Sequence, residues 1–143
     1  MDILHNNAKG TMLRAPANTV GTVTTAYVDM SDYERVRFVA LIGNIPSSCT
    51  VDIQVLQATS SAGAGAKTIT GGSITQLADS DDNKAVSLDI HAAALDLANS
   101  FEFVALKVMA PDTIVAGAWA DQYHARHGTI TQGTNYTQQV AVY

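Results

Sequence analysis

Hydrophobic and polar residues alternate along several short stretches of the chain, and the clearest of these is Thr50–Ala58. Val51, Ile53 and Val55 fall on one side of an extended chain, with polar residues between them. Because successive side chains of a strand point to opposite faces, this pattern predicts an antiparallel strand with one buried face.

A second hydrophobic signal is the tetrapeptide Phe-Val-Ala-Leu, which occurs at Phe38–Leu41 and again at Phe103–Leu106. Each copy lies in an apolar run with charged residues at its border, as expected for strands that cross the core. The residues that flank the two copies do not match in register. We therefore interpret the repeat as two central strands of one domain and not as a duplication.

Other runs rich in β-forming residues predict further strands, separated by turns of Gly, Pro, Asp and Asn. With the runs above, the expected strands are Val20–Val28, Tyr33–Ile42, Thr50–Ala58, Thr68–Leu77, Ala85–Ile90, Phe101–Met109 and Thr113–Ala120. A turn is expected at Pro111-Asp112 and a short helix over His91–Leu97. Short strands at this spacing predict an all-β fold, an antiparallel β-sandwich of jelly-roll or immunoglobulin-like type.

The length of 143 residues fits a single domain. We expect the sandwich to span residues 20–122. Residues 1–19 are mixed and polar and would form an extended N-terminal arm. Residues 123–143 would form a polar C-terminal arm, which can end in an edge strand at Val140–Tyr143.

Composition narrows the range of functions. Only 15% of residues are charged, against about 25% in typical soluble domains, so much of the surface must be Thr, Ser, Asn, Gln and Ala. Such a surface suits a protein packed among neighbours. The net charge is −5 and the eight Lys and Arg residues are scattered, which argues against nucleic-acid binding. Without a signal-peptide pattern or an apolar stretch of about 20 residues, we expect synthesis in the cytoplasm and no membrane partner.

Two clusters of side chains have the atoms needed to bind a metal ion. Asp79, Asp81 and Asp82 could offer oxygens to calcium, but no Glu closes an EF-hand-like loop, so a solvated acidic turn is favoured. His124 and His127 would share a face of a helix and could hold a metal, although their segment lacks a clear helical pattern. No metal or cofactor is therefore expected.

Catalytic patterns are equally weak. The single cysteine, Cys49, follows a turn and has no positioned base. The two glutamates, Glu34 and Glu102, do not suggest an acid pair across a cleft. No Gly-x-Ser-x-Gly or phosphate-binding loop occurs; Gly63 and Gly65 belong to a small-residue loop. We therefore predict no catalytic residues and no enzyme.

The order of strands and turns resembles that of small virion proteins of tailed bacteriophages. The similarity begins with Thr24–Val36 and covers roughly residues 20–120. It continues through Gln57-Ala58-Thr59 into the Ser-Ser-Ala-Gly-Ala-Gly-Ala-Lys loop, then Ile74–Leu77, the acidic turn Asp79–Asn83 and an Ala-Ala-Ala-Leu-Asp segment. The tail after Tyr123 is not part of the similarity.

This resemblance implies a structural protein of the phage particle, and within that class a capsid decoration (cement) protein. Such proteins are small, commonly trimeric, and bind the outside of the shell formed by the major capsid protein. The expected location is thus the capsid surface, and deletion of residues 1–19 would abolish capsid binding without unfolding the sandwich. The alternatives are a head–tail connector, tail or fibre-base protein, and a jelly-roll carbohydrate-binding module or enzyme that uses Trp119, Tyr123 and the histidines.

Overall fold

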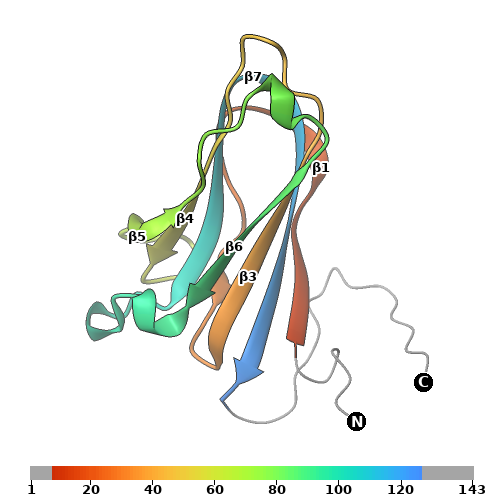
Figure 1. Cartoon of the computed structure of the whole chain (residues 1–143). Helices are drawn as coiled ribbons and strands as arrows, with labels where there is room; N and C mark the ends of the chain where they lie inside the picture. Colours follow the sequence, from red (N-terminus) through yellow and green to blue (C-terminus); the bar gives the residue numbers. More distant parts are fainter. Residues whose placement is uncertain (1–7, 127–143) are drawn as a thin grey trace, which may run out of the picture.

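A computed structural model describes residues 8–126, which form strands and three short 3-10 helices (Figure 1). The strands are β1 (Ala8–Thr24), β2 (Val28–Asp29), β3 (Tyr33–Ile42), β4 (Asp52–Ala58), β5 (Lys67–Ser73), β6 (Ala85–His91) and β7 (Phe103–Ala125). The 3-10 helices are η1 (Asp79–Asp81), η2 (Ala92–Ala94) and η3 (Leu97–Asn99). This architecture confirms the expected all-β antiparallel sandwich, which is jelly-roll-like and nearly closed. In the described range, no helix is long and apolar enough to span a membrane.

Strand β7 organises the whole fold. It is 23 residues long, and its first half pairs with β4 while its second half pairs with β3. Its other edge pairs with β1 and β2. The single sheet, in the order β5-β4-β7-β3-β6, is thereby folded into two layers that share β1 and β7. We call them the β4 layer (β5, β4, β2 and the nearby halves of β7 and β1) and the β3 layer (β6, β3 and the other halves).

The bend between the layers is built into the β1–β7 pairing. Thr19 is paired with Ile114 but Gly21 with Ala110, so β7 has more residues than β1 in this interval. Such a bulge bends and twists a strand without ending it. The expected turn at Pro111-Asp112 is therefore a bend inside one continuous strand, where the sequence predicted two strands.

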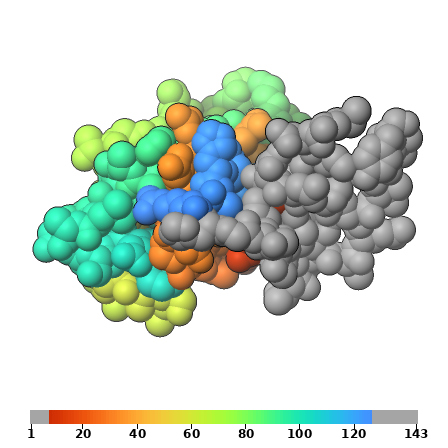
Figure 2. All heavy atoms as spheres, turned by 90° about the horizontal axis from the view of Figure 1, so that it is seen from below, coloured from red at the N-terminus to blue at the C-terminus, as the bar shows by residue number. Residues whose placement is uncertain are grey.

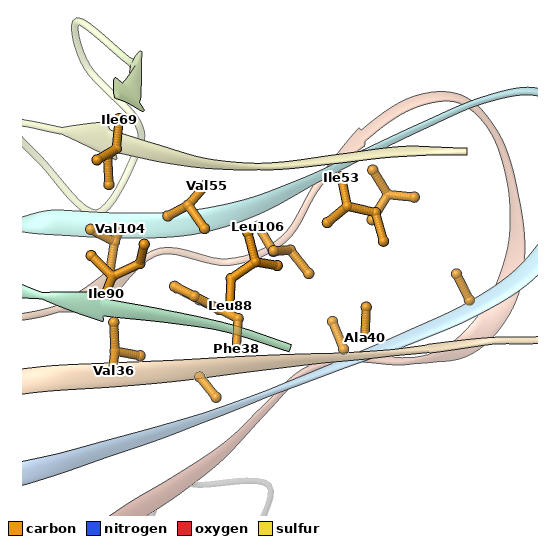
Figure 3. Close-up of a cluster of buried hydrophobic side chains, with 14 of the residues drawn as sticks. Val36, Phe38, Ala40, Ile53, Val55, Ile69, Leu88, Ile90, Val104 and Leu106 are labelled. Carbon is orange, nitrogen blue, oxygen red and sulfur yellow. The ribbon is translucent and has the colours of Figure 1, made fainter. Parts of the chain in front are cut away.

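Inward-facing side chains of both layers form the core. Figure 3 shows Val55, Val104 and Leu106 of the β4 layer facing Phe38 and residues of β6 in the β3 layer. Phe38, Val55, Val104 and Leu106 have no exposed surface. Burying a side chain of this size stabilises a fold by about 1.5–3 kcal/mol, so this cluster holds the two layers together.

The two copies of Phe-Val-Ala-Leu face the core in opposite registers. In β3, Phe38 and Ala40 belong to the core, whereas in β7 the core residues are Val104 and Leu106. Identical tetrapeptides thus present different side chains to the interior. This agrees with two independent central strands and does not support a duplication.

The ends of the sandwich differ from the expected arms. Ala8–Thr19 pair with β7 inside the sheet, and β7 extends beyond residue 122 to Ala125. The backbone N–H of Arg126 donates to Asp32 O at 2.7 Å, and in the view from below the end of β7 (blue) lies among residues around the start of β3 (orange; Figure 2). Deleting residues 1–19 would remove most of β1, so that deletion cannot separate binding from folding. The remaining residues of both predicted arms lie outside the described range.

Candidate functional site: the outer face of the β3 layer

The outer face of the β4 layer is covered by the chain itself. Leu56 and Ala105 are opposite one another in the β4–β7 pairing and are buried, although they lie outside the main core cluster. The loop between β4 and β5 approaches Tyr27 so closely that a Cβ on Gly63 would lie 2.8 Å from the Tyr27 ring. Burial raises the pKa of Tyr27. The apolar residues at the centre of this layer's outer face are therefore covered, and its exposed apolar side chain is Val20 near the bend of β1.

An ion pair and a cation–π contact stabilise the β4 layer at β5. Lys67 Nζ lies 2.5 Å from Asp96 Oδ2 and 3.9 Å from the centre of the Phe101 ring. The Asn99 side-chain amide also donates to Asp96. The hydrogen bond from Lys67, followed by that from Asn99, lowers the pKa of Asp96. These contacts connect β5 to the segment between β6 and β7.

The outer face of the β3 layer is different, because apolar side chains remain exposed on it. Val39 is paired with Trp119 and Leu41 with Gly117, while the Gly43 N–H donates to Val115 O at 2.8 Å. Leu41 is 53% exposed and Val115 is 45% exposed. We define the apolar patch as Pro16, Val39, Leu41, Val115 and Trp119.

Pro16 of β1 packs closely against Gly117 of β7 within this patch. A Cβ added to Gly117 would lie 3.1 Å from Pro16 Cγ and 3.3 Å from Pro16 N. Glycine at this position lets the bulged part of β1 lie against β7. The exposed Pro16 of β1 and Leu41 of β3 consequently lie on either side of Gly117, on the two strands that flank β7.

Charged and aromatic residues occupy the other end of the same face. Arg37 lies directly opposite Asp121 of β7 on one side and Asp89 of β6 on the other. The Trp119 Nε1–H donates to Asp121 Oδ1 at 2.8 Å, and the Tyr123 hydroxyl donates to Asp89 Oδ1. These bonds fix both carboxylates on the outer surface of the sheet.

Tyr123 crosses β3 to reach Asp89, and its environment reflects that position. Burial, and then the hydrogen bond to Asp89, raise the pKa of Tyr123, while Arg35 acts in the opposite direction. The ring also contacts His124 edge to face, with 5.3 Å between ring centres. The face thus combines exposed apolar area with fixed polar groups, a composition suited to protein docking.

The ligand clusters weighed from the sequence have structural roles where they are described. Asp81 accepts from the Ala78 N–H and from Lys84 Nζ, and these bonds lower the pKa of Asp81. Asp82 accepts from the Ile45 N–H at 2.5 Å. Within residues 8–126, no group of three or more His, Cys, Asp or Glu is placed to hold a metal.

The remaining candidates are dispersed. Cys49 is buried in the core. His124 is exposed, with Nδ1 3.9 Å from Glu34 Oε2. His127 lies outside the described residues, so the absence of a metal at His124 and His127 remains an expectation.

Sequence reasoning placed Leu41 and Val115 in core strands and so missed the apolar patch. The sequence did contain a signal. Arg37, Val39 and Leu41 are alternate residues of β3, so their side chains lie on one face of the sheet, and the charged Arg37 identifies that face as the outer one. On β7, Asp121 and Val115 are likewise an even number of residues apart, so the charged Asp121 indicates that Val115 faces outward. The general hydrophobicity of both runs concealed this alternation.

No protein-family model matches the chain, and no curated protein matches it by sequence. Among solved structures, the PBSX exported protein XepA is similar over 100% of this chain, at 9% identity and a TM-score of 0.55. The infectious bursal disease virus VP2 subviral particle is similar over 83% of the chain, at 9% identity and a TM-score of 0.51. This chain covers 46% of XepA and 32% of VP2, so it spans less than half of either protein.

These likenesses concern the fold. They place the chain among jelly-roll-like all-β sandwiches, an architecture found both in a viral capsid protein and in a phage-derived protein.

Proposed function

We propose that this chain is a non-enzymatic structural protein of a phage virion, and specifically a capsid decoration (cement) protein. Its partners would be the major capsid protein, on the outer surface of the shell, and further copies of itself. The resemblance of the sequence to small phage virion proteins favours a trimer. The structural likeness to a capsid protein and to a phage-derived protein supports the broader assignment to a virion component.

The observation that carries the proposal is the apolar patch on the β3 layer. Leu41 and Val115 are large hydrophobic residues left about half exposed on the outer face of the sheet. A contiguous apolar patch next to fixed charges is typical of a protein interaction site. Repetition of a modest contact over a symmetric shell gives strong total attachment, so each contact can remain small.

The patch can be tested with a matched pair of variants. Leu41→Asp puts a charge at the centre of the patch, whereas Leu97→Asp makes the same change at another exposed leucine, in η3. Full-length protein would be mixed with shells assembled from the major capsid protein of the same genome and then sedimented. We expect Leu41→Asp to weaken binding at least about tenfold, because a buried unpaired charge costs more than 1.4 kcal/mol. Leu97→Asp should bind like the wild type.

Absence of wild-type binding to shells, or equal loss in both variants, would contradict the proposal. The main alternative, a head–tail connector, tail or fibre-base protein, predicts gold-labelled protein on the tail axis in electron micrographs of virions. A carbohydrate-binding module is a lesser alternative. Trp119 and Tyr123 do share the outer face, but their polar groups already bond to Asp121 and Asp89. Glycan-array binding that depends on Trp119 would favour that function.

A further inference from the structure

Strand β6 is a regular sheet edge that β5 of the other layer approaches without pairing with it. It pairs with β3 over seven consecutive positions, from Ala85 to His91, without a bulge, Gly or Pro. The edge strand of the other layer, β5, is interrupted by a register shift, and its Gly71 has a positive φ of 77°. Proteins commonly protect edges through such irregularities, and a flat edge without them accepts another strand. Figure 1 shows β6 as the outermost strand of its layer.

The hydrogen-bonding groups at this edge can be assigned. The Ile42 N–H donates to Lys84 O at 2.9 Å, which fixes the phase of the β3–β6 ladder. Because antiparallel ladders alternate, residues 86, 88 and 90 bond to β3, and residues 85, 87, 89 and 91 direct their N–H and C=O groups outward. Within the described part of the chain, the backbone groups of Ser87 and Asp89 have no partner strand.

We propose that this edge binds β6 of a second copy of the chain, antiparallel, about a two-fold axis at Leu88. In that register the outward-directed backbone groups of one strand meet those of the other. Ser87 then faces Asp89 of the second copy, and Ala85 faces His91 of the second copy. A register displaced by two positions would set Asp89 against Asp89, which like-charge repulsion disfavours. The opposite displacement would set Ser87 against Ser87 and leave His91 outside the pairing, so the register about Leu88 is the one that pairs all four outward-directed residues without a charge clash.

The joined strands would continue the β3 layer across two chains. The side chains of Ala85, Ser87, Asp89 and His91 are exposed on the same outer face as the apolar patch. Two patches would consequently lie on one extended surface. An isologous contact of this kind pairs chains, so it gives a dimer, or a hexamer where it joins two trimers.

A proline substitution at the edge of β6 tests the two-fold contact without removing a hydrogen bond of the fold. Ser87→Pro removes an N–H that β3 does not use and blocks an incoming strand, as proline does on natural edges. Ser87→Ala keeps the N–H and serves as the control. In sedimentation equilibrium of the full-length protein without shells, we expect the dissociation constant of the two-fold contact to rise on the order of tenfold or more for Ser87→Pro. It should remain unchanged for Ser87→Ala.

Charge changes at the same position test the register. Ser87→Asp would face Asp89 of the second copy, and Ser87→Lys would attract it. Because the two-fold axis repeats each pair, we expect about a fivefold weakening for Asp and a strengthening of similar size for Lys. Thermal unfolding of each variant shows whether the monomer is intact.

Amide hydrogen exchange followed by NMR gives a second readout that needs no substitution. The N–H groups of Ser87 and Asp89 should become protected as the protein concentration rises, while that of Leu88 stays protected throughout. A wild-type chain that remains monomeric or purely trimeric, or a Ser87→Pro variant that associates like the wild type, would overturn the proposal. Protection of Ser87 and Asp89 only when shells are added would also overturn it, because the occupant would then be the capsid protein. The contact elaborates the self-association in the proposed function, but its sedimentation tests contain no shells, so either proposal can fail alone.

Discussion

The side-chain hydroxyl of Thr25 accepts a hydrogen bond from a backbone N–H of β7 that no neighbouring strand accepts. Substitution of Thr25 therefore tests how much this hydroxyl stabilises the fold. Thr25 lies between β1 and β2, beside the first half of β7. Its N–H donates to Leu106 O at 2.9 Å, and its Oγ1 accepts from the Leu106 N–H at 3.0 Å. Thr25 is 7% exposed and Leu106 has no exposed surface, so water does not replace the hydroxyl. A side chain therefore completes the ladder where the backbone of β1 turns away.

Thr25→Val keeps the shape of the side chain but leaves the Leu106 N–H without an acceptor. A buried donor that loses its partner costs about 1–3 kcal/mol. Thr25→Ser keeps the hydroxyl and loses one methyl group, which costs about 0.8 kcal/mol on the transfer scale. We therefore expect the valine variant to be less stable than wild type by roughly 2 kcal/mol, and less stable than the serine variant.

Equilibrium urea unfolding of the three proteins measures this difference. The midpoint should fall in the order wild type, Thr25→Ser, Thr25→Val, with an unchanged denaturant slope, because the surface exposed on unfolding stays the same. Equal stability of the valine variant and wild type would refute the assigned role of the hydroxyl. So would a serine variant that is less stable than the valine variant.

Three further predictions concern the covered β4 layer and the aromatic end of the β3 layer. Gly63→Ala should lower the unfolding free energy by about 1–2 kcal/mol in urea titrations, because φ is +82° and the new Cβ would meet Tyr27; unchanged stability would contradict this close approach. Lys67→Met should lower the melting temperature at pH 7 but not in acid. The pKa of Asp96 is lowered in the folded protein, so the stability that Asp96 contributes is present above its ordinary pKa of 3.8. This stability is lost as the pH falls through the lower pKa of the folded protein. A deficit that persists in acid would show that the ion pair is not its cause. The pKa of Tyr123 is raised in the folded protein, so the stability that Tyr123 contributes is present below pH 10 and is lost as the pH rises through the pKa of the folded protein. Tyr123→Phe should therefore reduce the loss of stability at alkaline pH and remove one late-titrating phenol from the ultraviolet titration. An unchanged stability profile together with an unchanged titration would contradict this prediction.

Local patterns were sufficient to predict the fold class and most strands. Alternation identified β4, and apolar runs with charged borders identified β3 and the first half of β7, because these strands bury one or both faces. The continuity of β7 could not be predicted in this way. Pro111-Asp112 favours a turn locally, and the bend becomes a strand because β1 pairs along the whole length of β7. That pairing joins residues about 100 positions apart, which no local pattern encodes.

The inclusion of Ala8–Thr19 in the sheet was missed for a related reason. Gly10 and Pro16 are turn-forming residues, so the segment resembled an arm. In the structure Gly10 pairs regularly with Asp121, and Pro16 lies in an irregular stretch with register shifts between Met12 and Arg14 and between Arg14 and Ala17. The apolar patch was missed because exposed and buried hydrophobic residues alternate within one run. In β3, the position of the charged Arg37, an even number of residues from Val39 and Leu41, is what distinguishes the exposed residues from the buried ones.

The central position of β7 has a consequence for how the chain acquires its structure. β7 is the last described strand to be synthesised, yet β1, β2, β3 and β4 all pair with it. Until it leaves the ribosome, the earlier strands have only the β3–β6 and β4–β5 pairings available. Folding of this domain should accordingly wait for β7 and be slow for its length, as is general for sheets dominated by distant pairings. The strand edges of β1, β3 and β4 would thus stay unpaired, and the domain unable to assemble, until β7 closes both layers.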